Sequence, residues 1–198
     1  MFSLRQILFH SAAELEVMFS DMGDPLRWRR RELRSFGVTF GSELWIGRHL
    51  FIRVPGKMVF GERLSFGHYT QLYAYTSIEI GDDFTSASNL TIYTGTHDPQ
   101  TLVPRTEAVR IGDRVWCGAN VTILPGVTVG NDVVIGASSL VNTNVPDNSV
   151  VAGVPARVMR ALDRSRLDGL WTWAAEGRLP LTSGADKADG DQEPHAKT

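Results

Sequence analysis

The chain lacks the features that mark secreted, membrane and nucleic-acid-binding proteins. A single cysteine, Cys117, among 198 residues excludes a disulfide framework within one chain and suits a reducing compartment. No apolar run approaches the roughly 20 residues that a membrane-spanning helix needs, and charges at Arg5, Glu14 and Glu16 make the start a poor signal peptide. The net charge of −2 argues against a general nucleic-acid binder. We therefore expect a soluble cytoplasmic protein.

Between residues 111 and 145 the sequence repeats every six residues. This period matches neither a helix nor a simple alternating strand. It fits a chain that turns after each short strand, so that three sides close a triangular coil of about 18 residues, stacked on the next coil at about 4.8 Å. Glycine recurs at the second place, where we expect unusual backbone dihedral angles. The first places are Ile111, Cys117, Ile123, Val129, Ile135 and Val141, and the fifth places are Val115, Val121, Val127, Val133, Ser139 and Val145.

Weaker hexads begin at Phe40, and two irregularities interrupt them. The register slips by two residues after Ile52 and again near Ile78, which predicts longer corners there. After Ile92 the repeat breaks and then resumes at Val109. The residues between, near 97–108, should form a loop that leaves the coil, and such loops commonly carry function.

Both flanks differ from the repeat. Residues 1–35 have partly helical spacing, with a helix start at Asp24-Pro25. Five arginines within residues 27–34 form either a solvated face or a contact with an anionic surface. Residues 36–157 should form the coil domain, 158–180 a helix that closes its open end, and 181–198 a disordered tail.

Three motifs follow one another in a fixed order: GTHDP at 95–99, IGDRVW at 111–116 and VAGVPAR at 151–157. Together with the hexads they resemble the hexapeptide-repeat acyltransferases, in particular the group of maltose, galactoside and polysaccharide O-acetyltransferases. The resemblance implies an all-β fold, a left-handed parallel β-helix with flanking N- and C-terminal helices. It also implies a homotrimer with active sites between subunits, and acetyl-CoA as co-substrate without a metal.

His97 is the candidate catalytic residue. It stands where the repeat breaks and should face a groove, and an imidazole can take a proton near neutral pH, as a hydroxyl nucleophile requires. The resemblance implies that His97 is the general base and that the acceptor oxygen attacks the thioester directly, without a covalent enzyme intermediate. The backbone N–H of Ala119 or Gly118 would stabilise the oxyanion.

The resemblance also suggests acceptor-binding residues. Trp116, which we expect at a corner, would line the acceptor site opposite His97 across a subunit boundary. Asp98 either orients His97 or binds a sugar, or only begins the turn at Asp98-Pro99. Gly67 and Tyr75 stand where the family commonly has Asn and Asp, which makes maltose or a galactoside a doubtful acceptor. Tyr75, with His68, Tyr69 and Tyr73, forms either an aromatic sugar platform or simple coil packing.

Seven residues are candidates for binding acetyl-CoA. The small residues Gly118, Ala119 and Ala137 would let the pantetheine arm lie close to the coil, although tight corners alone would also explain them. The others would approach the phosphates, for which arginine is well suited. They are Asn142, Thr143, Arg157 and Arg160. Cys117, at an inward position, should be a buried apolar residue and not a nucleophile.

The sequence therefore predicts an acetyl-CoA-dependent O-acetyltransferase that acts on a hydroxyl of a sugar or polysaccharide precursor. One alternative is a non-enzymatic trimeric scaffold on the same β-helix. Another is a γ-type carbonic anhydrase, which needs three histidines converging on zinc. The five histidines contain no His-x₄-His pair; they are His10, His49, His68, His97 and His195.

Overall fold

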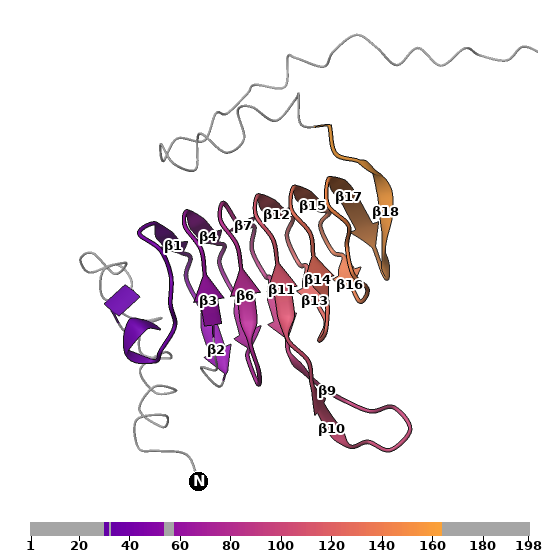
Figure 1. Cartoon of the computed structure of the whole chain (residues 1–198), viewed down its shortest axis with the longest axis horizontal. Coiled ribbons are helices and arrows are strands. Elements are labelled where there is room, and N and C mark those ends of the chain that lie inside the picture. The colour runs from indigo at the N-terminus through magenta and orange to yellow at the C-terminus, as the bar shows by residue number, and fades with distance from the viewer. Residues whose placement is uncertain (1–29, 32, 54–57, 164–198) are drawn as a thin grey trace, which may run out of the picture.

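The computed structural model describes residues 30, 31, 33–53 and 58–163, and there the chain winds into a left-handed parallel β-helix of about five turns (Figure 1). The predicted fold class is confirmed. Three sheets form the sides of the coil, and the chain visits them in a fixed order. We name them the seven-stranded, five-stranded and four-stranded faces.

The strands are short and mostly parallel. The seven-stranded face holds β1 (Leu44–Ile46), β4 (Leu64–Phe66), β7 (Thr85–Ser86), β12 (Val115–Cys117), β15 (Val133–Ile135), β17 (Ser149–Gly153) and β18 (Ala156–Ala161). The five-stranded face holds β2 (Phe51–Arg53), β5 (Gln71–Tyr73), β8 (Thr91–Tyr93), β13 (Thr122–Ile123) and β16 (Leu140–Val141). The four-stranded face holds β3 (Met58–Phe60), β6 (Ile78–Ile80), β11 (Val109–Ile111) and β14 (Thr128–Val129). An antiparallel hairpin, β9 (Gly95–His97) and β10 (Pro104–Thr106), stands outside these faces.

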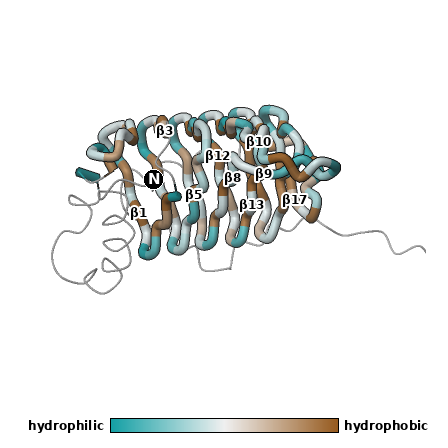
Figure 2. Tube along the Cα trace, turned by 90° about the horizontal axis from the view of Figure 1, so that it is seen from below, coloured by the Kyte–Doolittle hydropathy of each residue, from teal (hydrophilic) through white to brown (hydrophobic). Residues whose placement is uncertain are grey.

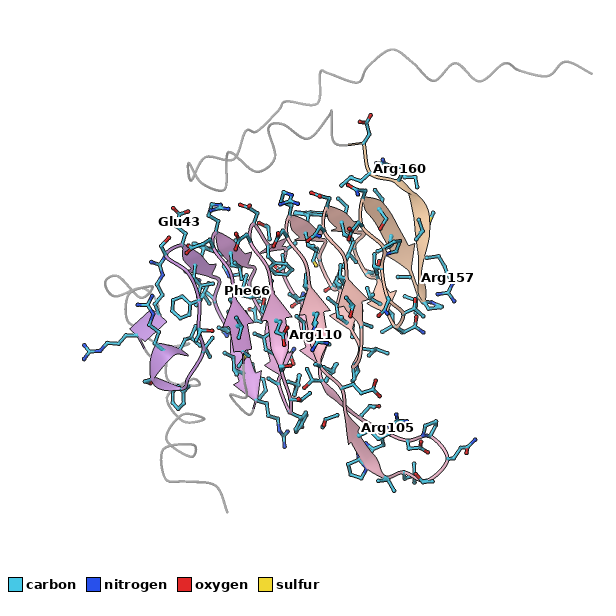
Figure 3. The ribbon with its side chains drawn as sticks, in the orientation of Figure 1. Glu43, Phe66, Arg105, Arg110, Arg157 and Arg160 are labelled. Atoms are coloured by element: carbon cyan, nitrogen blue, oxygen red, sulfur yellow. The ribbon has the colours of Figure 1, made fainter. Side chains whose placement is uncertain are left out.

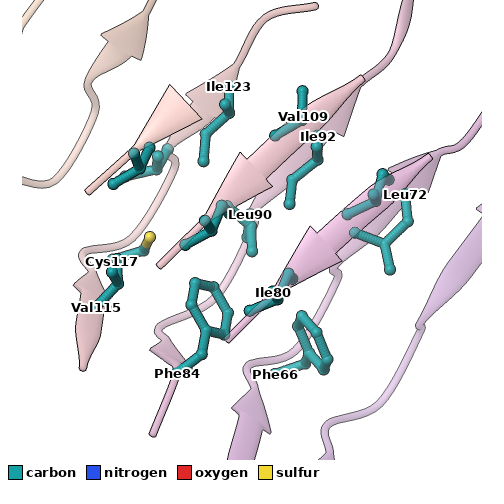
Figure 4. Close-up of a cluster of buried hydrophobic side chains, with 14 of the residues drawn as sticks. Phe66, Leu72, Ile80, Phe84, Leu90, Ile92, Val109, Val115, Cys117 and Ile123 are labelled. Carbon is teal, nitrogen blue, oxygen red and sulfur yellow. The ribbon is translucent and has the colours of Figure 1, made fainter. Parts of the chain in front are cut away.

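The core is a column of apolar side chains inside the coil (Figure 4). Every first and fifth hexad residue between Ile111 and Val145 is buried, as the repeat predicted. Ser139 is the polar member of this column, and its hydroxyl donates to the carbonyl of Gly136 at 2.7 Å. In the early coils Phe66 packs between two other phenylalanines, with its ring centroid 5.3 Å from that of Phe60 and 5.5 Å from that of Phe84. Polar residues gather at the corners (Figure 2).

The lengths of successive coils confirm the two register slips. Leu44 pairs with Leu64, 20 residues later, whereas Trp116 pairs with Val134, only 18 residues later. The two additional residues of each longer coil lie between the five-stranded and the four-stranded face. We call this position the hairpin corner. The hairpin β9–β10 leaves the coil at the same corner, between β8 and β11.

Glycine at the second hexad position has a different cause from the one expected. A Cβ atom on Gly112 would lie 2.8 Å from the carbonyl carbon of Gly130, and one on Gly118 would lie 2.6 Å from the nitrogen of Ala137. Close approach of the next coil therefore requires these glycines. The left-handed dihedral falls instead on the fourth position, for example at Asn120, where φ is 59°.

A ladder of side chains joins the coils where the four-stranded face turns into the seven-stranded face, which we call the ladder corner. Each carboxylate or amide oxygen accepts a backbone N–H from the preceding coil. Asp113 accepts from Asp82 at 2.9 Å, and Asn131 accepts from Asp113 at 2.8 Å. These bonds pair N–H groups that would otherwise point into solvent between coils.

The first coil is capped by arginines. Residues 30, 31 and 33–35 are helical, and Arg30 Nε donates to the carbonyl of Leu44 in the edge strand β1 at 3.0 Å. The Arg34 guanidinium carbon lies 4.6 Å from the centroid of the Phe40 ring. These two arginines therefore contact their own chain, and covering an edge strand prevents unwanted pairing. Residues 1–29 lie outside the described residues.

The prediction of a helix that begins at residue 158 is wrong for its first residues. Residues 156–161 form β18, which pairs antiparallel with β17 and ends the seven-stranded face. Pairing with the last coil outweighs the helical spacing of the apolar residues. The remainder of that helix and the tail at 181–198 lie outside the described residues. In the described part of the chain, no helix is long and apolar enough to cross a bilayer.

Candidate active site

The hairpin β9–β10 carries His97 away from the coil. His97 pairs with Pro104 at the outer end of the two paired strands, and the His97 side chain is exposed. The base of the hairpin is closed where the N–H of Glu107 donates to the carbonyl of Thr94 at 2.9 Å. The expected expelled loop is thus an ordered hairpin, and the side chain of His97 on it is exposed.

Two residues of the coil fix the base of this hairpin. Thr94 is fully buried; its hydroxyl donates to the carbonyl of Tyr73 and accepts the N–H of Thr76, both at 3.0 Å. Tyr75, 45% exposed, lies at the same corner one coil earlier and packs against Gly95. The structure therefore brings Tyr75 to the backbone that carries His97.

Asp98 holds the turn of the hairpin. Its Oδ1 accepts the N–H groups of Thr101 at 2.9 Å and Gln100 at 3.0 Å, and the Thr101 hydroxyl at 3.1 Å. Arg105 lies 3.5 Å from its other oxygen. Hydrogen bonds from Thr101 and Gln100 lower the pKa of Asp98. These contacts favour the alternative in which Asp98 begins the turn.

Trp116 is not at a corner, contrary to expectation. It is the middle residue of β12, between the inward-facing Val115 and Cys117, so its indole points outward from the seven-stranded face. That face and the hairpin lie on opposite sides of the coil (Figure 1). His97 and Trp116 therefore cannot line one site within a single chain.

The candidate acetyl-CoA residues separate into three groups. Gly118, Ala119 and Ala137 meet on successive coils where the seven-stranded face turns into the five-stranded face, which we call the third corner. Asn142 and Thr143 are exposed at the hairpin corner. Arg157 and Arg160 stand on the terminal strand β18 (Figure 3). Arg157 pairs with Ala152, whose Cβ would meet a Cβ on Gly136, so Arg157 lies on the coil next to Ala137.

The proposed four-residue aromatic platform does not form. Tyr73 stacks on Tyr93 with ring centroids 4.6 Å apart, on the five-stranded face. Tyr75 lies at the hairpin corner, as described above. His68 and Tyr69 lie at the third corner in the early coils, where Tyr69 stacks on His49. The four residues therefore belong to three different places.

Neither a thiol nucleophile nor a metal ligand set is evident in the described residues. Cys117 is fully buried, and burial raises the pKa of its thiol to about 12. Across residues 30, 31, 33–53 and 58–163, no three histidine, cysteine, aspartate or glutamate side chains are placed to hold a metal ion. His49 and His68 lie at the third corner, and His97 lies on the hairpin.

Comparisons with known proteins agree with the repeat and the coil. The family model described as "Bacterial transferase hexapeptide (six repeats)" matches residues 108–143. The putative lipopolysaccharide biosynthesis O-acetyl transferase WbbJ of Escherichia coli K12 is 36% identical over 140 residues, 64% of this chain and 70% of its own. The putative colanic acid biosynthesis acetyltransferase WcaF of the same organism is 34% identical over 136 residues, 68% and 75% of the two chains.

Solved structures show the same fold. A maltose O-acetyltransferase from Clostridium difficile 630 superimposes with a TM-score of 0.66 at 26% identity, covering 81% of this chain and 90% of that one. A galactoside acetyltransferase in complex with coenzyme A has a TM-score of 0.60 at 24% identity, with 78% and 80% coverage. The chain belongs to the hexapeptide-repeat acetyltransferase family. It is an acyltransferase enzyme.

Proposed function

We propose that this protein is an acetyl-CoA-dependent O-acetyltransferase that acts on a hydroxyl of a sugar unit. The observation that carries the proposal is the exposed imidazole of His97, held on a hairpin that the coil fixes at Thr94 and Gly95. The names of WbbJ and WcaF, which refer to lipopolysaccharide and colanic acid biosynthesis, support a glycan precursor as the acceptor. The related structure solved with coenzyme A supports the donor.

In the proposed reaction His97 removes the proton of the acceptor hydroxyl while the oxygen attacks the thioester carbonyl. The tetrahedral oxyanion collapses to the ester, and the departing thiolate of CoA takes the proton from the imidazolium. The N–H of Gly118 already donates to the carbonyl of Ile135 at 2.8 Å. No acceptor among the described residues takes the N–H of Ala119. This difference supports Ala119 as the donor to the oxyanion.

The site is proposed to lie between subunits of a homotrimer. His97 and Trp116 lie on opposite sides of one coil, so only a neighbouring chain can bring them together. The five-stranded face also presents outward-facing apolar side chains that pack only in part within the chain. They are Phe51, Tyr73, Tyr93, Leu124 and Leu140.

Oligomers that combine two different variant subunits test both the general base His97 and the proposed site between subunits. We expect His97→Ala and Trp116→Ala each to lower acetyl transfer by about 100-fold or more as pure proteins. Co-expressed and purified as mixed oligomers, the two variants should regain activity, because some sites would combine His97 of one chain with Trp116 of another. The measurement is thiol release from acetyl-CoA with a panel of sugar acceptors.

Three results would contradict the proposal. Turnover of His97→Ala near that of the unmodified protein would remove the general base. Mixed oligomers no more active than the pure variants would place the two residues in separate sites. Absence of transfer to every sugar acceptor of the panel by the unmodified protein would argue against a sugar hydroxyl as the acceptor.

A further inference from the structure

A straight row of outward-facing residues runs along the seven-stranded face from Trp45 to Trp116. Trp45 pairs with Ser65, Ser65 with Thr85, and Thr85 with Trp116. The two indoles are therefore three coil steps apart, about 14 Å at the usual strand spacing. Between them lie only two small hydroxyl side chains. We call these four residues the tryptophan strip.

Aromatic rings continue from Trp45 around the third corner. The His68 ring meets the Trp45 ring edge-on, with centroids 5.9 Å apart at 77°. Its Nδ1 accepts the N–H of Arg48 at 2.9 Å, so in the neutral ring Nε2 carries the proton and can donate. Beside it, His49 and Tyr69 stack at 4.4 Å with an interplanar angle of 6°.

The requirements of the fold do not account for these rings. Trp45 is 44% exposed and Tyr69 is 51% exposed, so neither belongs to the core. His49 and Tyr69 also adopt φ angles of 60° and 61°, a left-handed conformation that disfavours residues with large side chains. The equivalent corner positions of later coils hold smaller residues, Asn89, Asn120 and Ser138. These rings contact one another outside the core, and departures from local preference are expected where a protein binds something.

We infer that the acceptor surface extends along the tryptophan strip and that the acceptor is an oligosaccharide or polysaccharide and not a single sugar. This inference rests on the proposed function, which places Trp116 beside the reacting hydroxyl. A sugar ring offers an apolar face of C–H groups and an edge of hydroxyls. The indole of Trp45 and the phenol of Tyr69 suit the face. The hydroxyls of Ser65 and Thr85 and the Nε2 of His68 suit the edge.

The ring of Trp45 would then bind a sugar unit well removed from the site of acetylation. Binding energy from such a remote unit should raise kcat/KM for long acceptors and leave short ones unaffected. Trp45 would be a residue that determines specificity by acceptor length, without touching the reacting atoms.

The test compares acceptor series from disaccharide to hexasaccharide, each built on one repeating sugar: glucose, galactose, mannose or N-acetylglucosamine. For the unmodified protein, kcat/KM should rise with length in at least one series. Trp45→Ala should lower kcat/KM for the hexasaccharide by roughly 5-fold to 10-fold, as loss of one aromatic stacking contact predicts, and leave the disaccharide within 2-fold. Val59→Ala is the matched control, because Val59 is 51% exposed in the same coil but on the four-stranded face.

Calorimetric titration of the hexasaccharides without acetyl-CoA separates this inference from the proposed function. Binding that Trp45→Ala weakens by the same factor upholds the strip even if no acetyl transfer is found. The inference is overturned if none of the hexasaccharides binds, if kcat/KM does not depend on length in any series, or if Trp45→Ala affects short and long acceptors equally. It is also overturned if Trp45→Ala changes only the urea midpoint, which would give the indole a structural role.

Discussion

The ring of Tyr75 lies against the backbone of Gly95, so closely that a Cβ atom on Gly95 would come 2.6 Å from Cδ2 of the ring. His97 follows two residues later on the same strand, β9. The contact therefore couples a side chain of one coil to the position of the proposed base on the next.

Gly95→Ala should tilt the hairpin away from Tyr75 and lower kcat by roughly 10-fold to 100-fold, because small displacements of a catalytic group are costly. Tyr75→Ala combined with Gly95→Ala should recover part of the loss, since the ring that obstructs the new methyl group is gone. The measurement is kcat in all four members of the double-mutant cycle. If the two losses simply add, Tyr75 does not position the hairpin.

Asp132 and Arg114 join successive coils at the ladder corner. Arg114 donates from Nε at 2.7 Å and from Nη2 at 3.0 Å, and Asp132 is 6% exposed. Asp132→Asn removes the charge and keeps a residue that tolerates the φ of 58° found there. We expect a loss of about 1–3 kcal/mol in the free energy of unfolding, measured with urea.

The matched control is Asp83→Asn, at the same corner two coils earlier. Asp83 also has a φ of 58° and accepts two hydrogen bonds from Arg63, but the side chains of that pair are 20% and 41% exposed. Solvent screening should limit its loss to about 1 kcal/mol or less. Equal losses for the two variants would show that burial does not govern the strength of these pairs.

Cys117 should be chemically inert while the protein is folded. Burial raises the pKa of its thiol from 9.0 to about 12, so at pH 8 the thiol stays protonated and inaccessible. Modification by a disulfide reagent should therefore proceed only as fast as the chain unfolds. Rapid reaction of the folded protein at pH 8 would disprove the inward placement.

The raised pKa of the Cys117 thiol also predicts the direction in which the free energy of unfolding changes at alkaline pH. Between pH 9 and about 12 the unfolded thiol loses its proton while the folded thiol keeps it. The folded state then binds more protons, and its stability falls as the pH rises through this range. Cys117→Ala should remove that part of the pH dependence.

The repeat predicted the core well because burial depends only on which residues point inward. The first and fifth hexad positions specify that direction, and even the two-residue slips near Ile52 and Ile78 carried through into longer coils. Contacts between coils were harder to predict. Gly112 is required by the neighbouring coil, and the acceptors of the ladder corner, such as Asp113 and Asn131, recur once per coil and not once per hexad.

Candidate site residues could be chosen from the sequence, but their arrangement could not. The break after Ile92 indicated the position of the hairpin. The sequence around Tyr75 did not indicate that the Tyr75 ring would support that hairpin. Trp116 was expected at a corner because the hexads were divided between Trp116 and Cys117, whereas the strand runs through both. The helical spacing after Val158 gave way to pairing with β17, a long-range contact that local periodicity does not report.

All the additional residues of the described coils enter at the hairpin corner, so that lengthening the chain there leaves the stacking distance between coils unchanged. This corner can therefore accept insertions of very different size, from two residues to a complete hairpin, without cost to the column of buried side chains. A variant library aimed at new acceptors should vary length there, and keep the other two corners fixed.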